Sequence, residues 1–169
     1  MNRTLQKAVE LTKYNGTNTM VWKEGNILVW YKLGQTIVIP TNAGWKSNGE
    51  NVMGAGIAKE ASLIVPKLPS IYGEFCQQKN PRVYLKELHL ICVPSKPLNT
   101  SSPHLSWKQD ADFATVRTSL EWLEANSEQF PNPVYVPLLG AGNGGLDKDL
   151  VRELMDSILK NEKFIGVIW

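Results

Sequence analysis

Cysteine is scarce in this chain, with only Cys76 and Cys92 among 169 residues. Each lies in an apolar or mixed stretch, and neither their number nor their spacing suggests a disulfide framework or a zinc site. We therefore predict two reduced thiols that pack as small hydrophobic side chains, as in cytoplasmic proteins. No metal ion and no other cofactor is expected.

Long hydrophobic runs and an excess of one charge are missing as well. No apolar run approaches the roughly 20 residues that span a bilayer, and residues 1–10 lack the apolar core of a secretory signal. The formal net charge of +2 is too small for a surface that coats nucleic acid. These absences predict a cytoplasmic protein without a membrane partner, and we expect a monomer.

The composition is that of a globular domain. Hydrophobic residues make up 43% of the chain and charged residues 20%, which is ordinary for a folded protein of this length. No internal repeat, low-complexity tract or linker divides the sequence. We expect a single domain over residues 1–169, with residues 1–18 as an N-terminal extension.

The hydrophobic pattern predicts both strands and helices. Apolar and β-branched runs predict strands over residues 19–23, 26–32, 35–41, 88–93, 134–139 and 164–169. Spacings of three and four predict helices over residues 5–13, 55–64 and 70–78, from Asp110 onward, and through Leu150 to Ile158. The alternation predicts an α/β fold with three layers, α/β/α, and a mixed central sheet.

A first glycine loop, residues 42–54, follows the strand that ends at Thr41-Asn42. The run Met53-Gly54-Ala55-Gly56 then opens a helix. Glycines let the backbone approach a diphosphate, and a helix N-terminus offers free N–H groups. By itself, this pattern favours a tight strand-to-helix connection without a ligand.

A second glycine loop, residues 140–146, strengthens the ligand interpretation. It has four glycines in six residues and lies between a buried strand and a helix, which is typical of an anion-binding nest. The lysine of a nucleotide-hydrolysing P-loop is missing. Because both loops follow strand ends, they should border one cleft at the carboxyl edge of the sheet.

Four segments together resemble the ADP-ribose-contacting segments of macrodomains: Glu24-Gly25-Asn26-Ile27, Thr41-Asn42-Ala43, Met53-Gly54-Ala55-Gly56-Ile57-Ala58 and Pro137 through Leu146. The match covers about residues 20–169. Within the family the chain looks most like the branch of terminal ADP-ribose protein glycohydrolase and of antitoxin macrodomains that strip ADP-ribose from DNA. Pro94-Ser95-Lys96 and the later Trp107 match that branch's Pro-x-Lys before a tryptophan.

The resemblance assigns a role to each loop. Asn26 lies where many macrodomains have an aspartate that accepts from the adenine amino group, and an asparagine carbonyl can also accept. Asn42 is expected to contact the distal ribose. The ligand-binding residues implied by the resemblance are Asn26, Ile27, Asn42, Val52, Met53, Gly54, Ala55, Gly56, Ile57, Gly140, Ala141, Gly142, Asn143, Gly144, Gly145 and Leu146.

The resemblance implies a catalytic role for Lys96, together with Asn42. Lys96 matches the lysine that attacks or polarises the anomeric carbon of the distal ribose in the glycohydrolase branch; the alternative is a surface cation that only pairs with phosphate. The chain departs from the family at its catalytic acids and its second asparagine, where it has Ala55, Gly144 and Trp45. A loop over residues 97–106 also separates Lys96 from Trp107.

Other polar and aromatic residues have two interpretations. Asn48, Glu50 and Asn51 could orient a water or bind the distal ribose, or could serve turn geometry alone. His104 could act as an acid or base, or be an inert loop residue. Asp147 is expected at a helix N-terminus. Tyr72, Trp107 and Trp122 fit core or groove positions better than base stacking.

Three functions therefore remain open. The first is a hydrolase that removes ADP-ribose from a modified protein or nucleic acid. The second is a phosphatase acting on ADP-ribose 1''-phosphate. The third is a non-catalytic binder of ADP-ribose, of ADP-ribosylated targets or of a free nucleotide signal. In each case the expected partner is ADP-ribose or a molecule that carries it.

Overall fold

A computed structural model describes residues 20–169 of the chain. The predicted helix over residues 5–13 and the predicted N-terminal extension lie outside the described residues.

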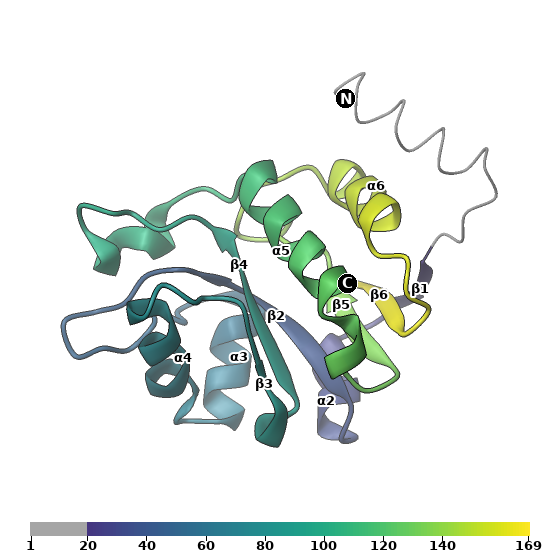
Figure 1. Ribbon diagram of the computed structural model, residues 1–169, viewed down its shortest axis with the longest axis horizontal. Helices are drawn as coiled ribbons and strands as arrows, with labels where there is room; N and C mark the ends of the chain where they lie inside the picture. The colour runs from purple at the N-terminus through teal and green to yellow at the C-terminus, as the bar shows by residue number, and fades with distance from the viewer. Residues whose placement is uncertain (1–19) are drawn as a thin grey trace.

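A six-stranded sheet in the order β1-β6-β5-β2-β4-β3 forms the centre of the fold (Figure 1). Its strands are β1 (Val21–Glu24), β2 (Thr36–Asn42), β3 (Val83–Leu85), β4 (Leu90–Lys96), β5 (Val134–Pro137) and β6 (Phe164–Ile168). Every pairing is parallel except that of the edge strand β3 with β4. The carboxyl ends of the five parallel strands therefore lie along the same edge of the sheet.

Helices cover both faces of the sheet. On one face lie α2 (Ile27–Lys32), α3 (Gly56–Ile64) and α4 (Leu68–Gln77), and on the other lie α5 (Phe113–Ala125) and α6 (Lys148–Ile158) (Figure 1). Three short 3-10 helices are η1 (Lys86–Leu88), η2 (Pro103–Lys108) and η3 (Ser127–Gln129). In the part of the chain described, no helix combines the length and apolar character needed to cross a membrane. The three-layer α/β/α fold with a mixed sheet is confirmed.

Alternation along the strands divides the interior into two cores. In β2, Ile37 and Ile39 pack with the α2–α4 layer, while Val38 between them packs with α5 and α6. All three side chains are fully buried, and the period of two places neighbours on opposite faces. This is why β2 and β4 read as continuous apolar runs in the sequence.

The prediction of a strand over residues 26–32 is wrong, because Ile27–Lys32 forms helix α2. The Asn26 side chain caps this helix by accepting from the Leu28 backbone N–H at 3.0 Å. Trp30 then stacks on Tyr135 of β5, with the ring centroids 5.0 Å apart. A short apolar run has no periodicity that separates a buried strand from one helical turn and a half, so packing decided.

Two other features differ from the expected pattern. The antiparallel edge strand β3 was not predicted, because three residues are too few to show alternation. The strand expected over residues 88–93 begins at Leu90 and continues to Lys96.

Both cysteines are free and buried, as predicted. Burial raises the pKa of the Cys76 thiol to about 12 and raises that of Cys92 as well. The two thiols therefore remain protonated and act as small hydrophobic side chains in the α2–α4 core.

Candidate functional site

A cleft of about 1030 Å³ lies at the carboxyl ends of β2, β4 and β5. Both glycine loops border it, and Asn42 and Lys96 are among its lining residues, which is the placement that the sequence predicts. Of the residues expected to bind the ligand, the lining contains Ile27, Asn42, Val52, Met53, Gly54, Ala55, Gly56, Ile57, Gly140, Ala141, Gly142, Asn143 and Gly144.

The remaining three expected residues, Asn26, Gly145 and Leu146, are not among the lining. The Asn26 oxygen is occupied by the helix cap of α2. Leu146 turns toward the core between the sheet and the α5–α6 layer, and its N–H donates to the Gly140 carbonyl at 3.0 Å. Gly145, with φ of +81°, forms the turn that brings the chain back.

Asparagine side chains shape the first glycine loop. Asn42 is buried, and its amide nitrogen donates to the Val52 carbonyl at 2.8 Å. Its amide oxygen accepts from the Gly44 N–H at 3.0 Å and from Asn51 Nδ2 at 3.1 Å. Asn42 therefore holds the two ends of the loop together, and one N–H of its amide remains for a ligand.

Asn51 lies beneath this loop and does not line the cleft. Its amide nitrogen also donates to the Asn42 carbonyl at 3.0 Å and to the Gly44 carbonyl at 2.8 Å. Asn48 and Glu50 pair with each other at the exposed tip of the loop. For all three residues the structure supports the interpretation as loop-shaping side chains.

Helix α3 begins directly at the cleft. Its N-cap residue Ala55 provides no side-chain hydrogen bond, so the first backbone N–H groups of the helix are not capped by that side chain. Such a helix end attracts an anion. Gly56, with φ of +59°, approaches the second loop so closely that a Cβ there would lie 3.2 Å from Asn143 Nδ2.

Backbone hydrogen bonds shape the second loop. The Ala111 N–H donates to the Gly144 carbonyl at 3.2 Å, and the Gly145 N–H donates to the Gly142 carbonyl at 3.1 Å. A Cβ at Gly144 would lie 2.5 Å from the Gly140 oxygen and 2.6 Å from Ala111 Cβ. The loop therefore has no room for the acidic side chain that the glycohydrolase branch has at this position.

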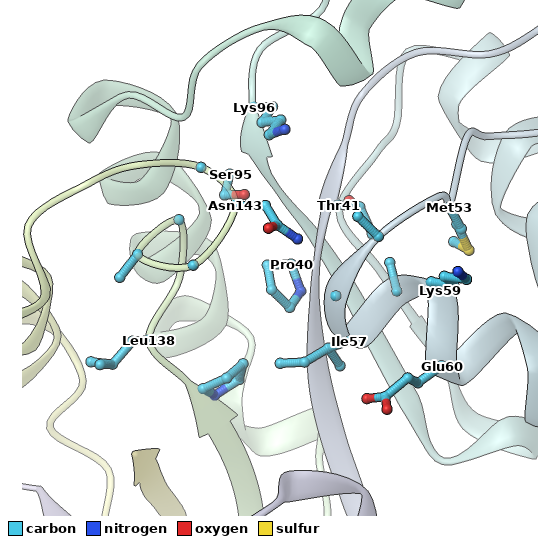
Figure 2. Close-up of a pocket in the computed structure, with 18 of the residues that line it drawn as sticks. Pro40, Thr41, Met53, Ile57, Lys59, Glu60, Ser95, Lys96, Leu138 and Asn143 are labelled. Carbon is cyan, nitrogen blue, oxygen red and sulfur yellow. The ribbon is translucent and has the colours of Figure 1, made fainter. Parts of the chain in front are cut away.

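A register shift at the end of β4 turns two polar side chains to the cleft. Thr41 pairs with Pro94 but Asn42 pairs with Lys96, so Ser95 has no partner across the ladder. Such irregularities re-aim side chains and are common beside active sites. Ser95 is buried and lines the cleft next to Lys96 (Figure 2). Sequence reasoning missed Ser95, because its neighbours Pro94 and Lys96 carried the motif.

The cleft has a net positive charge. Its charged lining residues are Lys59, Lys96, Lys148 and Glu60. Figure 2 shows Glu60 on α3 beyond Ile57, whereas Lys96 lies beside Ser95 at the end of β4. Across residues 20–169, no three His, Cys, Asp or Glu side chains cluster so as to hold a metal ion.

The aromatic and histidine candidates lie in different surroundings. Trp107 lines the cleft with 44% of its surface exposed. Tyr72 is buried, and its hydroxyl bonds Thr41 Oγ1 and the Pro81 carbonyl. Trp45 and Trp122 pack against the two cores. His104 is exposed on η2 and is not among the lining residues.

Comparison by structure gives clear matches, whereas no protein-family model and no curated protein matches the sequence. The DarTG protein of Thermosipho africanus, solved in complex with ADP-ribose, aligns with a TM-score of 0.69 and 21% identity over 89% of this chain. The chain spans 42% of the length of that protein.

Isolated domains match over nearly their full lengths. The DarG macrodomain of Mycobacterium tuberculosis has a TM-score of 0.66 and 23% identity, covering 89% of this chain and 97% of the other. The IBV X-domain has a TM-score of 0.55 and 13% identity, covering 90% and 91%. The chain has the macrodomain fold.

Proposed function

We propose that this protein binds ADP-ribose and removes it from a modified target as an ADP-ribosyl glycohydrolase. The observation that carries the proposal is the convergence of both glycine loops, the N-terminus of α3 and Lys96 on one cleft. A structural neighbour of the same fold was solved in complex with ADP-ribose, which supports the choice of ligand.

The diphosphate fits between the two loops. Backbone N–H groups of the second loop and of the first turn of α3 supply donors without any charged side chain. Lys59 and Lys148 add positive charge along the cleft. This arrangement holds a diphosphate and contains no P-loop lysine that would favour its hydrolysis.

The distal ribose is then directed toward Lys96 and Ser95. In the proposed reaction the bond between the anomeric carbon and the target breaks, and water supplies a hydroxyl to the ribose and a proton to the target. Lys96 attacks or polarises the anomeric carbon, and the free N–H of Asn42 holds the distal ribose. Positions 55 and 144, where the family has acids, carry no carboxylate here.

A non-catalytic binder is the second candidate. It is favoured by the same two positions, because Ala55 has no acidic group and the packing around Gly144 excludes one. The two candidates predict the same affinity for ADP-ribose and differ only in turnover.

Calorimetric titration with ADP-ribose, followed by turnover assays, tests the proposal. Substrates are ADP-ribosylated protein, ADP-ribosylated DNA and ADP-ribose 1''-phosphate, and the products distinguish released ADP-ribose with intact target from inorganic phosphate. We expect Lys96→Ala to bind ADP-ribose with an affinity within a few-fold of native and to lose turnover by about a hundredfold or more.

Lys86→Ala is the matched control, because Lys86 is an exposed lysine on η1 outside the cleft. Binding with no turnover on any substrate would establish the binder. Failure of the native protein to bind ADP-ribose would refute the ligand assignment itself.

A further inference from the structure

The segment between β4 and α5 returns to the cleft that β4 leaves. Lys96 ends β4, and the chain then runs outward before η2 brings Trp107 back. The Lys96 ammonium donates to the Trp107 carbonyl at 2.9 Å. Although Lys96 and Trp107 are separated in the sequence, a direct hydrogen bond therefore connects them in the fold.

Helix η2 is held in place by its contact with the first glycine loop. Gly44 is buried, and a Cβ there would overlap the Pro103 carbonyl oxygen and lie 2.6 Å from Ser106 Cβ. Because the obstructing atoms include backbone, a side chain at position 44 would displace η2. Ser106 is fully buried at this contact.

Hydrogen bonds inside the segment fix its shape. Ser106 Oγ accepts from the Asn99 N–H at 2.9 Å, and Asn99 Oδ1 accepts from the Ser102 N–H at 3.1 Å. On the other side of the contact, Gly44 is itself held by Asn51 Nδ2. The connection from Asn51 to Lys96 therefore consists of a hydrogen bond at each end, the close packing of Gly44 against η2, and the peptide link from Ser106 to Trp107.

We propose that η2, seated against Gly44, is a positioning element that holds the side-chain nitrogen of Lys96 in place for its role at the distal ribose. The role of η2 in the reaction rests on the proposed glycohydrolase function, whereas its restraint of the Lys96 side chain does not. Gly44 and the Trp107 carbonyl act through Lys96 and need not touch the substrate.

Chemical labelling in the absence of ligand measures how strongly the hydrogen bond to the Trp107 carbonyl restrains the Lys96 side chain. The native protein is treated with an acetylating succinimidyl ester. Peptide mass spectrometry then compares the acetylation rate of Lys96 with that of exposed Lys86 in the same molecule. We expect Gly44→Ala and Asn99→Ala each to raise the relative rate at Lys96 by about threefold or more, because a hydrogen bond to a charged group is lost.

Steady-state kinetics on the best substrate measure the consequence for the reaction. Both variants should lose about tenfold to a hundredfold in kcat with KM close to native, because misplacement by about 1 Å has an effect of that size. Asn99→Ala introduces no steric overlap, so it keeps the test decisive where Gly44→Ala does not fold.

Gly34→Ala is the control for general destabilisation. Gly34 has φ of +89° and open space around it, and it precedes β2 at the other end of the sheet. This variant should melt earlier and leave both Lys96 labelling and kcat unchanged.

The outcomes separate the two proposals. Unchanged labelling in folded Gly44→Ala and Asn99→Ala would overturn the positioning element, and so would faster labelling with native kcat. Faster labelling in a protein that turns over no substrate would leave the holding of Lys96 established and would refute the glycohydrolase.

Discussion

The two glycine loops border the same cleft but obtain their shapes in opposite ways. The first loop is held by side-chain amides: Asn42 and Asn51 both donate to its backbone, and Asn42 also accepts from the Gly44 N–H. The second loop is held by its own backbone bonds and by the absence of side chains at Gly140 and Gly144. The shape of the first loop therefore depends on the presence of side-chain amides, whereas the shape of the second depends on the absence of side chains at its glycines.

This difference bears on how each loop can change. A loop shaped by amides loses its form when one buried polar group is removed, because partners are left unsatisfied. A loop shaped by close backbone contacts loses its form when one methyl group is added. Each loop can therefore be tested by the kind of substitution to which it is sensitive.

The largest effect is expected from Gly144→Ala in the second loop. The added Cβ would lie within 2.6 Å of Gly140 and Ala111 atoms, so we expect a loss of about 3 kcal/mol in the free energy of unfolding. ADP-ribose affinity should also fall by about tenfold or more. Urea unfolding and calorimetry measure the two effects.

Gly142→Ala is the matched control for stability, because a Cβ at Gly142 meets open space. Its free energy of unfolding should stay within about 0.5 kcal/mol of native. Equal destabilisation by both variants would contradict the close-packed description of the second loop.

A smaller loss is expected from Asn51→Ala in the first loop. Removal of the amide leaves the Gly44 and Asn42 carbonyl groups without their donor, which costs about 2 kcal/mol for buried polar groups. Urea unfolding checks the value. Asn48→Ala in the exposed part of the same loop should change stability by less than about 0.5 kcal/mol, and a similar loss in both would show that the buried amides are not what holds the loop.

Gly56→Ala tests the point where the loops meet and should have a still smaller effect. Its φ of +59° strains an alanine, at a cost of about 1 kcal/mol. The new methyl group also presses on Asn143, so ADP-ribose binding should weaken a few-fold by calorimetry. Gly54→Ala, whose Cβ would meet only Val52 at 3.8 Å, should keep native stability.

A further effect is a pH dependence that reaches the first loop through Cys76. Burial raises the pKa of Cys76 from 9.0 to about 12, and Asn51 Nδ2 lies 3.9 Å from its sulfur. The folded state therefore prefers the protonated thiol. This contribution to stability is complete below pH 9 and is lost as the pH rises toward 12.

Hydrogen exchange of backbone amides near pH 10 measures the effect, with first-loop amides losing protection relative to those of the second loop. Cys76→Ala, which has no thiol to titrate, should remove this difference between the loops. Persistence of the difference in Cys76→Ala would assign it to another group.

The sequence predicted much of the site because glycine spacing is a local signal. The sequence alone places both loops, the strand ends that precede them and Lys96 at one edge of the sheet. Asn42 was expected at the cleft and lines it. Its role in bracing the loop depends on Val52 and Asn51, and their approach to Asn42 is set by the fold.

The incorrect and missing predictions all concern features that contacts in the folded structure determine. Residues 26–32 were expected as a strand, whereas they form a helix that the Asn26 side chain caps and that packs through Ile27, Leu28 and Trp30. Asn26 was expected to contact the adenine base, whereas its side-chain oxygen caps helix α2. Ser95 was overlooked because its exposure to the cleft arises from a register shift between two strands.

The sequence by itself determined the layered α/β fold, the edge where the cleft lies and the two glycine loops that border it. Periodicity, β-branched runs and glycines act over a few residues, so they can be read along the chain. The tertiary structure alone decided that Gly44 seats η2, that Trp107 returns to Lys96 and that Gly144 has no room for an acid. Those features depend on contacts between residues distant in sequence, where shape and packing, and not composition, select the arrangement.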